Sequence, residues 1–130
     1  MRLSDVQLNN IKEVGTLMLA TASKEGKPHC TIVEPSRYYN DRIIIPIVQM
    51  ETSKRNIEEN ENIFIHVFKE DKNDPEWSIQ YKMSCTAQIE TSGDLFEEVK
   101  HYEETEVLPD GFFVSGIIIA TIVECREYVG

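Results

Sequence analysis

Hydrophobic and polar residues follow a helical period near the start of the chain and a strand-like pattern soon after it. Leu8 and Ile11 fall on one face of a helix, and Ser4 and Gln7 have the spacing of a capping box. This pattern predicts a short helix over residues 4–13. The next segment, TLMLATAS, is rich in apolar and β-branched residues, and the KEGKP that follows has the Gly and Pro of a turn. The chain is therefore expected to pass from a helix into a β-hairpin.

The rest of the chain predicts five further strands and two helices. The strands are expected over residues 29–39, 42–50, 63–68, 78–91 and 115–129, and the helices over residues 53–61 and 94–104. Thr52 or Ser53 can cap the first of these helices, and Ser92 the second. The segment RIIIPIVQM is apolar enough for a strand covered on both faces. Pro46 within it lacks an N–H group, which predicts a bulge, an edge or a break at that point.

Six strands with helices set between and beside them favour one fold class. We expect a mainly β protein with short helices, built as a six-stranded antiparallel split β-barrel, and not alternating βαβ units. A length of 130 residues predicts a single domain spanning residues 1–130. A chain of this size buries only about two-thirds of its unfolded surface, so a homodimer would enlarge the core.

The charge, the hydrophobic runs and the cysteines of the chain limit its expected partners and its expected subcellular location. The 13 basic and 23 acidic residues give a net charge of −10, which repels nucleic acids and anionic membrane surfaces. No apolar run reaches the roughly 20 residues of a membrane-spanning helix, and the opening segment lacks the apolar core of a secretion signal. Cys30, Cys85 and Cys125 form no CxxC pair, which indicates reduced thiols. These features predict a cytoplasmic protein.

The familiar enzyme motifs are missing from the sequence. It has no GxSxG, HExxH or GxxxxGK[ST] motif and no GxGxxG after a strand, which weighs against hydrolases and nucleotide-binding folds. His29, His66 and His101 have no spacing that indicates a shared metal ion. We therefore expect no metal site and assign no catalytic residue.

A cationic cluster stands where the third predicted strand gives way to a helix. Thr52, Ser53, Lys54 and Arg55 combine two hydroxyl groups and two cations with the amide groups of a helix start. These groups together are typical of a phosphate site, and they contrast with the acidic chain around them. The alternative is a capped, solvated helix whose two cations pair with the glutamates one turn further on.

The order of several short motifs resembles a known family. The segment from Leu19 to Asn62 is similar to the FMN-binding split barrels related to pyridoxamine 5′-phosphate oxidase, and the likeness continues toward the end of the chain. The motifs that carry it are Ala20-Thr21, Gly26, Pro28-His29, Ile43 to Pro46, Thr52 to Arg55, Asn56-Ile57 and Asp94 to Lys100.

This resemblance implies a dimer with FMN in each of two clefts between the subunits. It implies that Thr52 and Ser53 donate hydrogen bonds to the FMN phosphate and that Lys54 or Arg55 supplies positive charge. Backbone groups at two strand ends would border the isoalloxazine ring. These ring-bordering residues are Val33, Glu34, Pro35, Ile47, Val48 and Gln49.

The chain departs from the family pattern in three places. Small flavin proteins of this kind often have a Gly-Gly pair where this chain has Val48-Gln49. They commonly place a lysine before the threonine of the cluster, where here the first cation, Lys54, follows Ser53. The longer relatives that oxidise pyridoxamine phosphate carry a second basic cluster, which this sequence lacks, so we do not expect that activity.

The leading hypothesis is an FMN-binding flavoprotein that passes electrons or hydride to an unidentified redox partner or small molecule. The first alternative is a split barrel that binds no flavin, or that binds another ligand such as haem or a deazaflavin. The second alternative is an interaction module in which Trp77 and Tyr81, beside a charged loop, form the contact surface.

Overall fold

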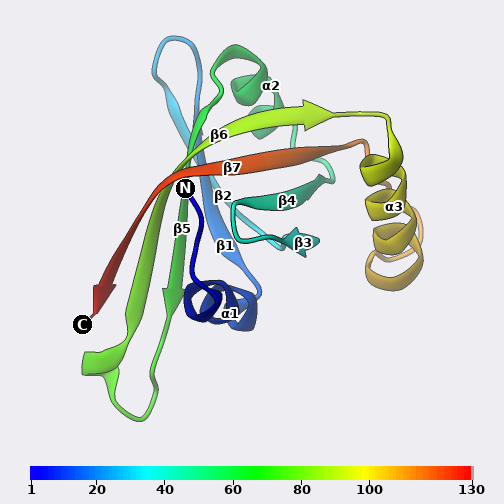
Figure 1. The fold of residues 1–130 in the computed structure, drawn as a ribbon. Coiled ribbons are helices and arrows are strands. Elements are labelled where there is room, and N and C mark those ends of the chain that lie inside the picture. Colours follow the sequence, from blue (N-terminus) through cyan, green and yellow to red (C-terminus); the bar gives the residue numbers. More distant parts are fainter. Residues whose placement is uncertain (130) are drawn as a thin grey trace.

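The computed structural model describes residues 1–129 and contains one curled antiparallel sheet (Figure 1). Its seven strands lie in the order β2-β1-β5-β6-β7-β4-β3. The strands are β1 (Leu17–Ala22), β2 (Pro28–Val33), β3 (Arg37–Tyr38), β4 (Arg42–Ile47), β5 (Asn62–Lys69), β6 (Ile79–Glu90) and β7 (Gly116–Val129). The helices are α1 (Asp5–Val14), α2 (Glu51–Glu59), α3 (Asp94–Tyr102), a 3₁₀ turn at Pro75–Trp77 and a π-helical turn at Glu103–Val107. A mainly β class with short helices is thus confirmed.

The prediction of six strands is wrong, because the segment over residues 29–39 forms two strands. Its first part, β2, pairs with β1 as far as Val33. Pro35 lacks an N–H group and restricts the residue before it, so the ladder stops there. The Ser36 N–H then donates to the Ile44 carbonyl at 2.9 Å, and β3 pairs with β4. The two halves of this segment consequently form opposite edges of the sheet.

Pro46 lies on the part of β4 that extends beyond the pairing with β3, which fits its missing N–H group. The Ile47 carbonyl accepts a hydrogen bond from the Ser115 N–H at 3.0 Å, so Ile47 faces the β7 side of β4. Alternate residues of a strand point their backbone groups to opposite neighbours, which turns Pro46 toward the β3 side. There β3 pairs with β4 only as far as Ile44, so Pro46 leaves no ladder bond unmade.

The helix starts match the sequence prediction in one case out of three. Ser4 caps α1 through a capping box with Gln7, which confirms the first helix. The cap of α2 is Met50, so Thr52 and Ser53 lie inside the first turn and do not cap it. The cap of α3 is Gly93 and not Ser92. At the starts of α2 and α3, the N-cap residue makes no side-chain hydrogen bond to the helix.

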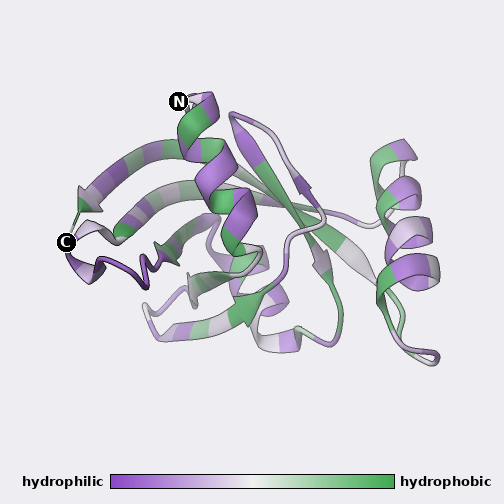
Figure 2. Ribbon diagram, turned by 90° about the horizontal axis from the view of Figure 1, so that it is seen from below, coloured by the Kyte–Doolittle hydropathy of each residue, from purple (hydrophilic) through white to green (hydrophobic). Residues whose placement is uncertain are grey.

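The curl of the sheet encloses the main core, and β4 is covered on both faces, as its continuous apolar run predicts. Ile43, Ile45 and Ile47 pack into the main core with residues of the other strands and α1. Ile44 faces the other way into a smaller core beneath α3. The members of this smaller core are Ile44, Phe96, Val99, Val114 and Ile117. Figure 2 shows the alternation of hydrophobic and hydrophilic residues along the other strands.

A polar network fastens α1 to the sheet. The phenol of Tyr81 is fully buried and accepts a hydrogen bond from Asn10 Nδ2 at 2.8 Å. Lys69 Nζ donates to Asn10 Oδ1 and to Glu13 Oε2, both at 2.7 Å. Burial raises the pKa of Tyr81. The interaction-module hypothesis placed Tyr81 on an exposed contact surface, and the burial of this residue shows that placement to be wrong. Trp77, the other residue of that hypothesis, is 63% exposed.

Replacing Asn10 with alanine should destabilise the fold by about 1–3 kcal/mol, because the buried Tyr81 hydroxyl loses its donor. Urea unfolding followed by circular dichroism measures the change. Adding Tyr81→Phe to the Asn10→Ala variant removes the stranded hydroxyl and should recover part of the loss. A double variant no more stable than Asn10→Ala would contradict this account of the network.

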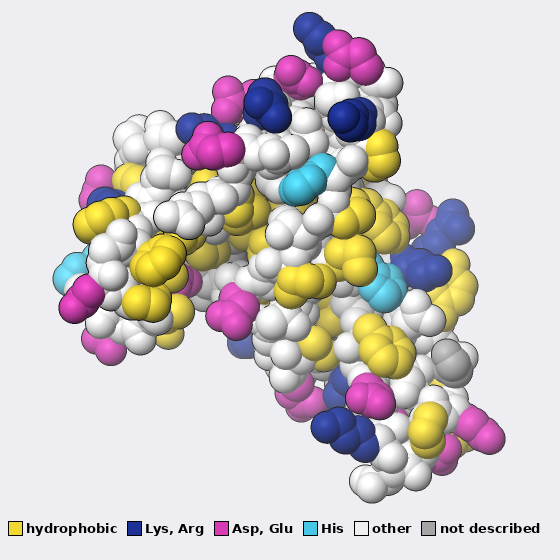
Figure 3. Space-filling view, turned by 180° about the vertical axis from the view of Figure 1, so that it is seen from behind, with side chains coloured by type: hydrophobic (Ala, Val, Ile, Leu, Met, Phe, Trp, Pro, Cys, Tyr) yellow, Lys and Arg dark blue, Asp and Glu magenta, His cyan; other side chains and the backbone are white. Residues whose placement is uncertain are grey.

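The convex face of the sheet, here called the outer face, carries exposed hydrophobic side chains. Met18 and Ile32 face each other across β1 and β2, and Phe64 pairs with Ala20 across β5 and β1. Ile32 is 64% exposed, and Phe68 further along β5 is 48% exposed. Figure 3, which shows the molecule from behind, has hydrophobic side chains distributed across its middle.

Within residues 1–129, no helix is both long and apolar enough to cross a membrane.

Candidate functional site

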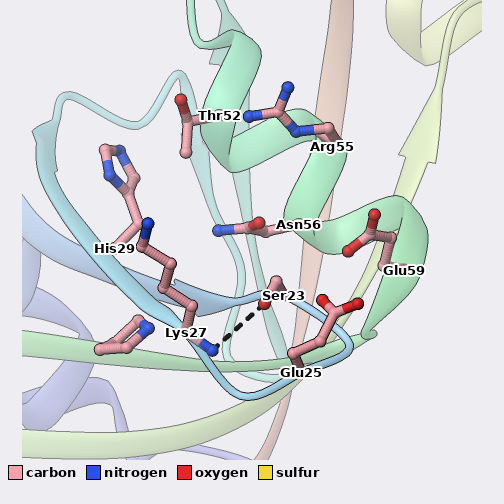
Figure 4. A pocket seen from close by; sticks show the side chains of 9 residues that line it. Ser23, Glu25, Lys27, His29, Thr52, Arg55, Asn56 and Glu59 are labelled. Carbon is pink, nitrogen blue, oxygen red and sulfur yellow. Dashed lines mark hydrogen bonds between the residues drawn. The ribbon is translucent and has the colours of Figure 1, made fainter.

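Two adjoining hollows flank α2 on the side of the β1–β2 hairpin. The first, here called the helix-start hollow, measures about 260 Å³ and lies where the chain leaves β4. It is lined by His29, Thr31, Gln49, Met50, Glu51, Thr52 and Ser53. The second, here called the hairpin pocket, measures about 510 Å³ and is drawn in Figure 4. It is lined by Ser23, Glu25, Lys27, Pro28, His29, Thr52, Arg55, Asn56 and Glu59.

The hairpin pocket forms because α2 presents one face to the turn between β1 and β2. Arg55 and Asn56 follow Thr52 by three and four residues, and Glu59 follows them by four and three, which places all of them on one side of the helix. Asn56 Nδ2 donates to Thr21 Oγ1 at 3.1 Å, and both residues are buried. Together these contacts hold the helix beside the hairpin.

A backbone contact ties the hairpin turn to the far end of α2. The Lys24 N–H donates to Glu59 Oε2 at 3.2 Å. Asn56 and Glu59 therefore anchor the helix to the strand and to the turn respectively, and the pocket lies between the two anchors. His29 and Thr52 line both hollows, so the two spaces adjoin at these residues.

The helix-start hollow is open to the unpaired amide groups of α2. The first N–H groups of any helix have no partner within it, and they give that end a partial positive charge. The N-cap residue Met50 makes no side-chain bond to them. The hydroxyl-bearing residues Thr52 and Ser53 line the same hollow. These groups suit a bound anion such as a phosphate.

The hairpin pocket has a mixed charge. Lys27 enters it from the hairpin, and Arg55 enters it from α2 with its side chain extending toward Thr52 (Figure 4). Glu25 and Glu59 lie on the rim at the turn. The pocket therefore offers two cations and two carboxylates, and one of the carboxylates already accepts a backbone hydrogen bond.

The structure separates the members of the predicted cationic cluster. Thr52 and Ser53 line the helix-start hollow, and Arg55 lines the hairpin pocket. Lys54 lines neither of these two spaces in the part of the chain that the structure describes. Adjacent residues of a helix point about 100° apart, which explains why neighbouring cations face different surroundings.

Of the predicted ring-bordering residues, only Gln49 lines one of the two hollows. Val33 and Ile47 belong to the main core, and Val48 packs against the core beneath α3. Pro35 is half-buried at the end of β2. The contact of these strand ends with a ring stays a prediction.

Glu34 lies near the π-helical turn. Burial raises the pKa of Glu103, the first residue of that turn, and the Glu34 carboxylate adds to the rise. Glu34 itself is exposed. Its contact with a flavin ring likewise stays a prediction.

Sequence reasoning did not select Lys27, His29 and Asn56 for the site. They come together only because the hairpin lies over α2, a long-range contact that no local spacing encodes. One signal was available, because Asn56 follows Thr52 by one helical turn. In residues 1–129, no cluster of three or more His, Cys, Asp or Glu side chains could hold a metal ion.

The turn between β4 and α2 is strained at Gln49. Its φ is 55°, the only positive φ of a non-glycine residue in residues 1–129. This left-handed conformation favours glycine because a Cβ atom crowds the following carbonyl, at a cost of about 1–2 kcal/mol. The strained residue lines the helix-start hollow, which marks this turn as the place where the site departs from the glycine-containing pattern.

Replacing Gln49 with glycine should stabilise the protein by about 0.5–1 kcal/mol, the relief of strain less the extra freedom that glycine has when unfolded. Val48→Gly is the matched control. Val48 contacts the core beneath α3 and has an ordinary φ, so glycine there should destabilise the fold. Denaturant melts of the two variants separate the effects, and a Gln49→Gly protein less stable than the parent would contradict the strain.

A comparison with protein-family models matches residues 4–122 to the family described as Pyridoxamine 5′-phosphate oxidase. No curated protein sequence matches the chain.

Several solved structures share the fold at low sequence identity. HupZ of Group A Streptococcus is 19% identical, with a TM-score of 0.80 over 98% of this chain and 95% of that one. HutZ, the haem storage protein of Vibrio cholerae, is 18% identical, with a TM-score of 0.69 over 99% and 95% of the two chains. An FMN-binding protein from Syntrophomonas wolfei is 16% identical, with a TM-score of 0.73 over 95% and 83%.

Proposed function

The chain belongs to the pyridoxamine 5′-phosphate oxidase family, and from this premise we propose that it is an FMN-binding flavoprotein. It would act as an oxidoreductase or an electron-transfer protein toward a redox partner or a small molecule. The observation that carries the proposal is the helix-start hollow, where an uncapped helix start meets two hydroxyl-bearing residues. The FMN-binding protein from Syntrophomonas wolfei has the same fold, which adds support.

The phosphate of FMN fits the start of α2. The amide groups of the first turn, the Thr52 hydroxyl and the Ser53 hydroxyl would donate hydrogen bonds to its oxygens. Arg55 extends along the helix toward Thr52 and would supply the opposing charge (Figure 4). Lys54 lines neither hollow, so we assign the charge to Arg55 between the two cations that the sequence left open.

The isoalloxazine ring would lie beyond Gln49, along the end of β4. Flavin supplies the redox chemistry when it is bound, and the protein supplies its orientation and electrostatic surroundings. Gln49 and Met50 line the hollow on that side, and the backbone of Gln49 would border the ring. The strand ends at Val33 to Pro35 and Ile47 to Val48 complete this proposed border. No catalytic side chain is needed for this role.

We further propose that the protein works as a homodimer of single-domain subunits in the cytoplasm. The outer face supports dimerisation, because a monomer would leave Ile32, Phe64 and Phe68 in water. The strand β2 carries both Ile32 on this face and His29 beside the hollows. A partner subunit seated on the outer face would thus approach the flavin site at this edge of the sheet.

The absorbance spectrum of the purified protein, followed by a titration with FMN, tests the proposal. Flavin absorbance in the visible region, or saturable quenching of FMN fluorescence at micromolar concentration, is the expected result. Colourless protein that leaves FMN fluorescence unchanged would overturn it.

The alternative ligand is haem, and one observation favours testing it. HutZ, named a haem storage protein, has the same fold. Gln49 lines the helix-start hollow, so this chain has a side chain at a position where small flavin proteins of the family often have glycine. A titration with haemin in the same instrument separates the two ligands, because haem gives a Soret band and flavin does not. A deazaflavin is distinguished by its own fluorescence.

A further inference from the structure

A buried carboxyl group lies where α3 gives way to the π-helical turn. Glu103, the first residue of this turn, is only 4% exposed. Its carbonyl accepts a hydrogen bond from the Leu108 N–H at 2.7 Å, which closes the turn. Single π-helical turns are rare in proteins and occur frequently at functional positions. A carboxyl group buried at such a turn is costly to ionise unless a cation or a hydrogen-bond donor lies beside it.

The chain between β2 and β3, here called the β2–β3 corner, lies beside this carboxyl group. The corner consists of Glu34, Pro35 and Ser36. The Ser36 Oγ atom is buried and has no hydrogen-bond partner among the residues that the structure describes. Burial raises the pKa of Glu103, the nearby Ser36 hydroxyl opposes the rise, and the Glu34 carboxylate adds to it. The turn thus meets a hydroxyl group that can bond to a protonated or an ionised carboxyl, and a carboxylate that repels only the ionised one.

The cations around the π-helical turn are already engaged with other carboxylates. Arg37 on β3 pairs with Glu98 on α3 at 3.0 Å. Lys100 on α3 pairs with Glu104, the second residue of the turn. Within residues 1–129, Glu103 itself forms no ion pair. Its ionised form would therefore be buried near a second carboxylate without a cation of its own, whereas its neutral form avoids both costs.

The same turn holds the segment that follows it. The α3 lobe, defined as α3, the π-helical turn and residues 108–115, stands at one end of the sheet (Figure 1). Glu104 Oε2 accepts a hydrogen bond from the Val114 N–H at 2.8 Å. Lys100 Nζ lies 5.9 Å from the centre of the Phe113 ring, which is part of the same segment. A displacement of the turn at Glu103 would therefore be transmitted to the rest of the lobe.

We propose that Glu103 and the β2–β3 corner form a pH-sensitive latch for the α3 lobe. When Glu103 carries a proton, its neutral carboxyl group stays buried and donates to Ser36 Oγ. Loss of the proton creates a buried negative charge near Glu34, so the turn moves toward water and the lobe loosens. The latch is closed at low pH and opens as the pH rises through the raised pKa of Glu103. It needs no bound cofactor and is independent of the proposed flavin function.

An NMR titration of the glutamate carboxyl groups in the full chain tests the latch. The midpoint of Glu103 should lie above that of Glu106, an exposed carboxylate of the same turn, and Glu34→Gln should lower it. Protection of the Leu108 amide against hydrogen exchange should fall several-fold as the pH rises through this midpoint, after correction for the intrinsic pH dependence of exchange. Glu103→Gln, which resembles the protonated form, should keep its protection over the same range.

The unfolding free energy provides a second measurement. The gain of Glu103→Gln over the parent protein should grow as the pH rises above the ordinary glutamate pKa, because the parent loses stability as its buried carboxyl group ionises. Glu106→Gln is the matched control, and its difference from the parent should not vary with pH. A Glu103 midpoint at or below that of Glu106 would overturn the latch. So would equal loss of Leu108 protection in the parent and in Glu103→Gln. If Glu103→Gln does not fold, a Glu103 midpoint that Glu34→Gln leaves unchanged would overturn it.

Discussion

Replacing Arg55 with alanine should weaken FMN binding about tenfold or more, while Lys54→Ala should change it less than about twofold. The two cations are adjacent in sequence, but only Arg55 lines the hairpin pocket and extends toward Thr52. A charge-assisted contact to phosphate is worth about 1.5–3 kcal/mol, which corresponds to this loss of affinity. Fluorescence titration with FMN measures both variants.

Lys54→Ala is the control for Arg55→Ala. Both remove one positive charge from α2, so a general effect of net charge on a dianionic ligand would weaken binding equally. Both residues lie near the surface, Lys54 half-buried and Arg55 exposed, so neither change should unfold the protein. Equal losses, or a larger loss for Lys54→Ala, would place the phosphate on another face of the helix.

Placing a carboxylate on the outer face should convert the proposed homodimer to a monomer. Ile32 is 64% exposed in the single chain and lies among the hydrophobic residues of β1 and β5. Glutamate at this position would be buried without a partner in the dimer, at a cost of several kcal/mol for each subunit. Analytical ultracentrifugation of Ile32→Glu should show a species of 15.0 kDa, the mass of one chain.

Val6→Glu provides the comparison for this experiment. Val6 is also an exposed hydrophobic residue, at 69%, but it lies on α1 away from the outer face. This variant should sediment like the parent protein at twice the mass of one chain. A parent protein that is itself monomeric would contradict the dimer, and an Ile32→Glu dimer would move the interface to another surface.

Most of the strands could be predicted from the hydrophobic pattern, because the burial of one or both faces of a strand determines where its apolar residues occur. The run RIIIPI could be recognised as doubly covered, and β4 does lie between two cores. The division of residues 29–39 was missed although Glu34, Pro35 and Ser36 interrupt the apolar and β-branched residues at the break. The proline signals that the ladder stops, but the pairing of the two halves with different neighbours depends on long-range contacts.

The candidate site was predictable only in its helical half. The cluster at Thr52 to Arg55 pointed to the start of α2, where the helix-start hollow lies. The hairpin half depends on Asn56 reaching Thr21 across 35 positions of the chain. The sequence could not choose between Lys54 and Arg55 either, since that choice depends on the residue at which the helix begins.

The position of β7 in the sheet has a consequence for folding during synthesis. The strands β3 and β4 are joined by hydrogen-bonded pairing to the rest of the sheet through β7, and β7 spans residues 116–129. A ribosome therefore releases β4, with its four buried isoleucines, long before the strand that must cover its edge exists. Pairings between strands so distant in sequence form slowly, and exposed apolar edges aggregate. Nascent chains should accordingly need protection by a chaperone until the last strand emerges.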